Sequence, residues 1–302
     1  MTTDTTSWFQ AVWQLRGSIL PAIFPRVLLC SALGFIISLI NYYGYSLPEQ
    51  IFGSVITNVA YNLVLGLLVV FRTNTAYDRY WEGRKIWGGI IINSLNLGRK
   101  IWLAVAETEP QDKDNKIAAL KLLGAFAIAT KLQLRRLPIN TELETLLTQS
   151  QYSQLKEVKN PPLKIALWIG DYLQKQQIDQ RLSMDELLAM NTSLDGMVEA
   201  FIGCERILTT PIPLAYAIYL KRLLLIYCFA LPLKLVHDLH LWTGVIVALI
   251  SFILLGIEEI GNQIEDPFGN DPNDLPLDEI CTNLVNNLAD FASEHESSMN
   301  VN

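Results

Sequence analysis

The sequence predicts an all-α integral membrane protein with four membrane-spanning helices and a large helical region outside the bilayer. Two long runs without charged residues lie near the N-terminus, and two further apolar runs lie in the last third of the chain. A helix needs about 20 residues to cross the hydrocarbon core of a bilayer, and each run reaches or approaches that length. Charged residues make up only 18% of the 302 residues, against about 25% in ordinary soluble domains.

The first two spans are predicted within residues 27–71, after an N-terminal segment of residues 1–26. The uncharged run from Val27 to Pro48 ends in a group of tyrosines, which are typical of the membrane–water interface. A second uncharged run continues from Gln50 to Phe71. The short link between the two runs contains glycine and proline, and it predicts a tight turn between antiparallel spans.

The pattern of residues 72–210, in which amphipathic stretches alternate with turns, predicts a helical region outside the membrane. Ser183 is followed three residues later by Glu186, which is the pattern of a capping box at the start of a helix. The stretch 117–134 is apolar but contains two lysines. We therefore predict a buried helix of this region there, rather than a membrane span.

The second pair of spans is predicted within residues 211–257. Residues 258–302 are predicted to form a polar C-terminal segment. Lys221 and Arg222 lie near the middle of the first of these apolar stretches. A charge at the bilayer centre costs about 2.5–3.5 kcal/mol. We therefore expect the membrane part to begin near Arg222, with both side chains extending to the interface.

The distribution of lysine and arginine predicts the orientation. Arg16 and Arg26 precede the first span, and a basic cluster follows the second, whereas the links 41–50 and 237–240 contain neither residue type. By the positive-inside rule, both termini and the middle region are expected in the cytoplasm. The net charge of −7 argues against a general nucleic-acid-binding protein, because such proteins are usually basic.

An apolar stripe marks the predicted second span. Leu63, Leu67 and Phe71 are four residues apart and therefore share one face of a helix. Periodicity alone favours a stripe that faces lipid or a neighbouring helix. The functional alternative is a hydrophobic neck, in which these side chains from several subunits strip ions of water and gate a pore by dewetting.

Three motifs carry a family resemblance. The run FRTNTAYDRYWEGRKIWG at 71–88, with RGSI at 16–19 and IEDPFGNDPNDLPLD at 264–278, closely resembles the bestrophin family, particularly its bacterial and plant branch. The resemblance implies a homopentameric ion channel around a central pore. It also implies that each subunit contributes four membrane helices and a large helical cytoplasmic region.

The resemblance implies roles for individual residues. By their position relative to the first motif, Leu63, Leu67 and Phe71 would form the neck of the pore. Arg72, just below them, would hold anions at the cytoplasmic mouth unless a salt bridge to Asp78 or Glu82 cancelled its charge. The family also has a narrow cytoplasmic exit, for which Met184 is the expected pore-facing residue.

The acidic segment around the third motif is a candidate calcium site. Calcium prefers six to eight oxygen ligands, but the spacing is not that of an EF-hand, and a solvated turn is the simpler interpretation. Animal bestrophins hold calcium at this motif, although bacterial relatives can keep the turn without an ion. No cofactor is required, and calcium remains a candidate. The matching side chains here would be Gln263, Asp266, Asp271 and Asp274.

We expect passive conduction of chloride, bicarbonate or other weakly hydrated small anions. The resemblance suggests a bacterial inner membrane or a thylakoid membrane. The alternatives are a monovalent cation channel of the same fold, a non-conducting membrane scaffold, and a membrane-embedded enzyme. The last is disfavoured because Glu258 and Glu259, as neighbours on a helix, point about 100° apart and make a poor acid–base pair. We therefore predict no catalytic residues.

Overall fold

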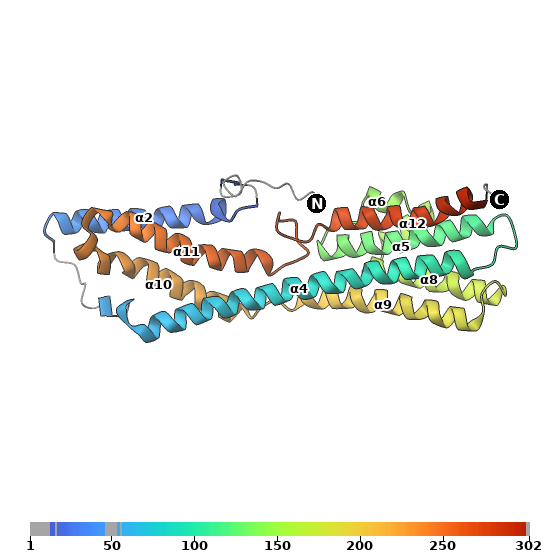
Figure 1. Cartoon of the computed structure of the whole chain (residues 1–302), viewed down its shortest axis with the longest axis horizontal. Coiled ribbons are helices and arrows are strands. Elements are labelled where there is room, and N and C mark those ends of the chain that lie inside the picture. Colours follow the sequence, from blue (N-terminus) through green and yellow to red (C-terminus); the bar gives the residue numbers. More distant parts are fainter. Residues whose placement is uncertain (1–12, 16, 46–52, 55, 300–302) are drawn as a thin grey trace. The chain divides into compact units, whose positions relative to one another are not determined.

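The computed structural model describes residues 13–15, 17–45, 53–54 and 56–299, with side chains described up to residue 293. Every regular element in these residues is a helix (Figure 1). Arg16 and most of the predicted turn between the first two spans, residues 46–50, lie outside the described part. The helices are α2 (Leu20–Tyr42), α4 (Val59–Ala104), α5 (Asp112–Leu134), α6 (Thr141–Glu144), α7 (Gln149–Leu155), α8 (Pro161–Ile178), α9 (Met184–Thr209), α10 (Leu214–Leu239), the 3-10 turn η1 (His240–Trp242), α11 (Thr243–Ile264) and α12 (Leu277–Met299).

The chain divides into two compact units. The first contains residues 1–80, 211–266 and 271–274, and the second contains residues 81–210, 267–270 and 275–302. α4 begins in the first unit and continues into the second as one helix of 46 residues. The helix does not end at the predicted limit of the second span, because no proline lies between Val59 and Ala104 to interrupt its hydrogen bonds.

In the first unit, α2 and α11 pack closely together. Gly34 lies against Gly244 so tightly that a Cβ atom on Gly34 would come within 2.9 Å of the Gly244 Cα. The Ser31 hydroxyl donates to the Gly244 carbonyl (3.1 Å), and the Ser38 hydroxyl donates to the His240 carbonyl (2.8 Å). Small residues therefore allow the close approach, and hydroxyl groups hold it, as is common between membrane helices.

Burial separates the candidate membrane spans from a core helix. Among the described residues, α2, α4, α5 and the stretch Leu214–Ile264 are long and apolar enough to cross a membrane. In the most apolar window of α5, 78% of the residues are buried, against 22–28% in the other three. A helix in contact with lipid keeps exposed apolar side chains in an isolated subunit, so α5 is a core helix, as the sequence predicted. The stretch Leu214–Ile264 supplies two helices, α10 and α11, which brings the candidate spans to four.

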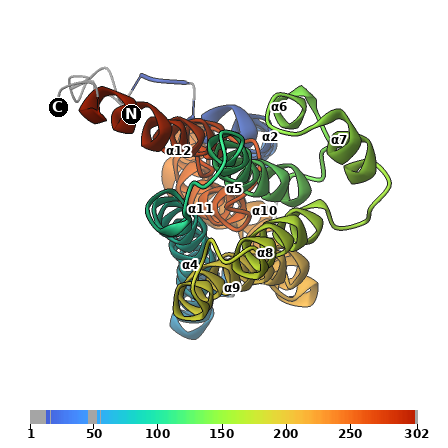
Figure 2. The same ribbon diagram turned by 90° about the vertical axis from the view of Figure 1, so that its right-hand side faces the viewer.

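The second unit is a bundle in which α5 packs against both α8 and α12 (Figure 2). The rings of Phe126 in α5 and Phe201 in α9 meet edge to face, with their centroids 6.3 Å apart. α9 begins with the predicted capping box: the Ser183 hydroxyl accepts the Glu186 amide, and the Glu186 carboxylate accepts the Ser183 amide. This prediction is confirmed.

Candidate ion pathway and its surrounding motifs

One face of α4 packs against other helices of the first unit. Leu65, Val69, Arg72 and Ala76, three or four residues apart, are all buried. Leu65 and Val69 form an apolar cluster with Leu220 and other residues of α10. This packing fixes the rotation of α4 about its axis.

The opposite face of α4 carries the predicted neck residues. At about 100° per residue, Leu67 points roughly opposite to Leu65. Leu63, Leu67 and Phe71 are 61%, 46% and 60% exposed. These three large apolar side chains point out of the subunit, toward lipid, a second subunit or a pore. Their assignment to a neck stays a prediction.

Arg72 does not share that face. Its side chain is only 3% exposed, and Nη2 donates to Glu265 Oε2 (2.5 Å) and Asn262 Oδ1 (3.2 Å). The charge is therefore compensated within the same chain, by α11 and the residue after it. The prediction that Arg72 presents its charge at the pore mouth does not fit this geometry. In the sequence, Asp78 and Glu82 are possible partners because they are near Arg72 in the chain. The observed partner, Glu265, lies 193 positions away.

Glu265 is a junction between two of the motifs. Besides Arg72, its carboxylate accepts the Ile212 amide (3.1 Å), and its carbonyl accepts a hydrogen bond from Arg79 Nε (3.3 Å). The first and third motifs therefore contact each other through buried and partly buried polar groups. Glu82, the other candidate partner, instead forms an exposed ion pair with Arg206 (2.9 Å).

The turn that follows Asp266 packs into the second unit. The Phe268 side chain is fully buried, and its ring lies 6.5 Å from that of Trp87. A Cβ atom on Gly83 would come within 2.7 Å of the Pro267 ring. Gly83 therefore leaves room for this turn, and the Trp87 ring covers it. Both residues belong to the first motif.

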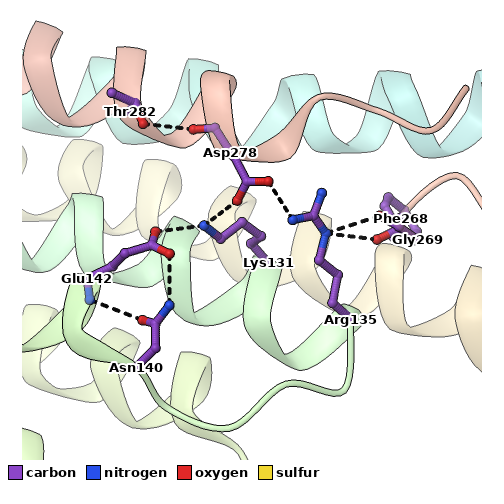
Figure 3. Close-up of polar contacts among 8 residues, drawn as sticks. All are labelled: Lys131, Arg135, Asn140, Glu142, Phe268, Gly269, Asp278 and Thr282. Carbon is purple, nitrogen blue, oxygen red and sulfur yellow. Dashed lines mark hydrogen bonds and ion pairs between the residues drawn. The ribbon is translucent and has the colours of Figure 1, made fainter. Parts of the chain in front are cut away.

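A network of charges holds the same turn to α5 and α12 (Figure 3). Lys131 is 2% exposed, and its ammonium group donates to Glu142 (2.7 Å) and Asp278 (2.8 Å). Arg135 donates to the other Asp278 oxygen (2.7 Å) and to the Gly269 carbonyl (3.1 Å). In the sequence, Lys131 interrupts an apolar run. In the structure, its charge is compensated by two ion pairs, with Glu142 and Asp278.

This network predicts a pH-dependent contribution to stability. Hydrogen bonds from Arg135 and then Lys131 lower the pKa of Asp278. A carboxylate with a lowered folded-state pKa stabilises the fold above its unfolded pKa of about 3.9, and that contribution is lost as the pH falls through the folded pKa. We therefore expect Asp278→Asn to lower the melting temperature at neutral pH, with the difference from wild type shrinking below about pH 4.

Asp290→Asn is the matched control, since Asp290 is an exposed carboxylate on the same helix, α12. Thermal unfolding of both variants between neutral and acidic pH measures the effect. Equal melting temperatures for Asp278→Asn and wild type at neutral pH would contradict the prediction.

Two of the four predicted calcium ligands, Asp274 and Gln263, accept hydrogen bonds from neighbouring groups. Asp274 Oδ2 accepts the Asp271 amide (2.6 Å), and Gln263 Oε1 accepts a hydrogen bond from the Asn273 side chain (2.8 Å). In the described part of the chain, no group of three or more His, Cys, Asp or Glu residues lies close enough to hold a metal ion. Calcium binding stays a prediction.

Met184, the predicted exit residue, is the first residue of α9 and is exposed. The capping box of Ser183 and Glu186 fixes the start of the helix at this residue. Its assignment to a constriction stays a prediction, since only an assembly of subunits would show what it faces.

The helices and their exposed apolar faces define a helical membrane protein with several spans. A family model described as bacterial/fungal bestrophin protein matches residues 1–290. The chain belongs to this bestrophin family and is an integral membrane protein.

Similar proteins cover nearly the whole chain. A protein of Nostoc sp. is 52% identical over 293 residues, 97% of this chain and 94% of the relative. A protein of Synechocystis sp. is 48% identical over 284 residues, 94% and 91% of the two chains. A more distant relative from Escherichia coli is 32% identical over 96% of this chain and 93% of its own. All three are named voltage-dependent anion channel-forming proteins.

Solved structures show the same fold. The crystal structure of a bacterial bestrophin homologue from Klebsiella pneumoniae superimposes with a TM-score of 0.79 at 28% sequence identity. The match covers 90% of this chain and 98% of the homologue. A point mutant of that homologue gives a TM-score of 0.80, also at 28% identity, over 90% of this chain and 99% of the mutant.

Proposed function

We propose that this protein is a subunit of an anion channel and that several copies line its pore with the exposed face of α4. The observation that carries the proposal is the rotation of α4. The face with Leu65 and Val69 is buried in the subunit, and Leu63, Leu67 and Phe71 point outward. The channel-forming names of relatives at 52% and 48% identity support the same function.

The assembly proposed is a homopentamer around one central pore, in a bacterial inner membrane or a thylakoid membrane, with both termini in the cytoplasm. In this arrangement the three apolar side chains of each subunit form stacked rings, and Met184 narrows the cytoplasmic exit. An apolar neck favours ions that lose water easily, such as chloride, bicarbonate or larger weakly hydrated anions.

In this proposal, the selectivity for anions arises without the charge of Arg72. Its guanidinium is paired with Glu265 and buried, so its net electrostatic effect on a passing ion is small. The aromatic ring of Phe71 offers an alternative, because the edge of a phenyl ring carries partial positive charge. With the ring edges turned into the lumen, the neck attracts anions without placing a formal charge there.

Reversal potentials test the proposal. The purified protein in a planar bilayer with a tenfold potassium chloride gradient is expected to reverse near the chloride equilibrium potential, about 59 mV from zero. Reversal near the potassium potential would instead establish the cation channel. Absence of single-channel current from correctly assembled protein would favour the non-conducting scaffold.

We also propose calcium as a ligand of the segment containing Gln263, Asp266, Asp271 and Asp274. A ligand that binds only the folded state at 100 times its Kd stabilises it by about 2.7 kcal/mol. Calcium is therefore expected to raise the melting temperature of wild type but not of Asp271→Ala. Asp195→Ala, which removes an exposed carboxylate of α9, is the control. The same calcium response in Asp271→Ala and wild type would remove the site.

A further inference from the structure

A cavity of about 570 Å³ opens between α2, α10 and α11 in the first unit. Its wall is mainly apolar and includes Leu29, Leu225, Phe229 and Leu255. Charged side chains gather among its lining residues as well, and they come from the N-terminal halves of α2 and α10 and the C-terminal half of α11. The cavity is separate from the exposed face of α4, because its lining contains no residue of that helix.

The charged end carries more cations than its carboxylates compensate. Arg26 lies 3.2 Å from Glu259 and 3.7 Å from Glu258, and Lys221 lies 3.7 Å from Glu258. Arg222 also lines the cavity, and it makes no ion pair or hydrogen bond with the part of the chain that the structure describes. Three cations therefore face two carboxylates, which leaves a net positive charge.

The apolar wall runs away from these charges along α10. Phe229 lies seven residues beyond Arg222, which at 1.5 Å per residue is a distance of about 10 Å along the helix. Leu225 lies between them and is exposed, and Leu255 of α11 lies one turn beyond Glu258 in the same direction. The cavity thus has a cationic mouth and an apolar wall about 10 Å long.

We propose that this cavity binds a phospholipid with a net negative headgroup. The guanidinium groups of Arg26 and Arg222 and the Lys221 ammonium suit the phosphate oxygens, and the apolar wall suits the upper part of one acyl chain. Basic pockets between membrane helices bind anionic lipid headgroups by the same chemistry. A free anion would use the cationic mouth but would leave the apolar wall without a ligand.

Lipid binding to the purified full-length protein tests the proposal. Native mass spectrometry would compare binding of phosphatidylglycerol and phosphatidylcholine to wild type and to two variants. Arg222→Gln is expected to weaken phosphatidylglycerol binding about fivefold, the effect of one cation at an anionic lipid surface. Leu225→Trp is expected to reduce binding of phosphatidylglycerol because the larger side chain fills the cavity.

Two matched variants separate the cavity from general effects. Arg99→Gln removes an exposed cation outside the cavity. Ile226→Trp places the same large ring about 100° around α10, on an exposed residue that does not line the cavity. Both are expected to bind phosphatidylglycerol as wild type does. Size-exclusion chromatography confirms that each variant keeps its assembly.

The proposal is overturned if Arg222→Gln keeps the wild-type preference for phosphatidylglycerol, or if Ile226→Trp weakens binding as much as Leu225→Trp. Inorganic phosphate alone is expected to leave the melting temperature unchanged, and stabilisation by it would overturn the assignment to lipid. None of these measurements depends on ion conduction, so the result is independent of the channel proposal.

Discussion

Leu67→Ala and Phe71→Ala are each expected to raise the single-channel conductance. Both side chains lie on the exposed face of α4, and in the proposed assembly they form the rings that an ion must pass without most of its water. Shortening a ring to alanine widens the neck and lets more water remain with the ion. A barrier lowered by about 1.4 kcal/mol increases the rate of crossing about tenfold. Recordings from purified protein in planar bilayers measure the change.

Leu39→Ala is the matched control for this experiment. Leu39 is an apolar residue of α2 with 49% exposure, close to the 46% of Leu67, but it lies on a different helix. Its replacement is expected to leave conductance and ion selectivity unchanged. If Leu67→Ala and Phe71→Ala also leave both properties unchanged, these residues do not line the pore, and the stripe faces lipid or another helix.

Glu265→Ala is expected to destabilise the protein by about 3 kcal/mol, because loss of one partner leaves a buried charge without compensation. Arg72 is buried, and its Nη1 atom already has no hydrogen-bond partner among the described residues. Glu265 also accepts the Ile212 amide at the start of the segment that leads into α10. Thermal unfolding of detergent-solubilised protein measures the loss.

Two further variants show whether burial of the charge is the cause. Glu82→Ala breaks the exposed pair with Arg206, and such pairs contribute only about 0–1 kcal/mol. The double variant Arg72→Met, Glu265→Ala removes both charges and is expected to be more stable than Glu265→Ala alone. A double variant that is less stable than Glu265→Ala would show that the guanidinium itself stabilises the fold by other contacts.

The sequence predicts those parts of this fold that depend on local patterns. Uncharged runs located the helices that became α2 and α11, and an apolar stretch interrupted by Lys221 and Arg222 located α10. The spacing of Ser183 and Glu186 located the start of α9. The buried state of α5 could also be predicted, since its lysines rule out contact with lipid at the bilayer centre. Each of these inferences needs only residues within a few turns of one another.

Contacts between distant segments could not be predicted in the same way. The ion-pair partner of Arg72 lies in the third motif, and the partners of Lys131 come from α6 and α12. Short-range charge patterns suggested Asp78 and Glu82 for Arg72, because a sequence shows which residues are near in the chain and not which are near in space. The uninterrupted α4 was missed for a different reason: a change from apolar to charged composition ends a membrane span, but it does not end a helix.

The pairing of Arg72 with Glu265 has a consequence for how ions would reach the pore. A bare arginine at the entrance would enrich chloride locally, and that enrichment would fade as salt shortens the Debye length, which is about 10 Å at 0.1 M. Because Glu265 neutralises the charge of Arg72, this residue does not enrich chloride at the entrance. Supply of anions to the neck would then follow the bulk concentration, and dilute solutions would gain no advantage from surface charge at Arg72.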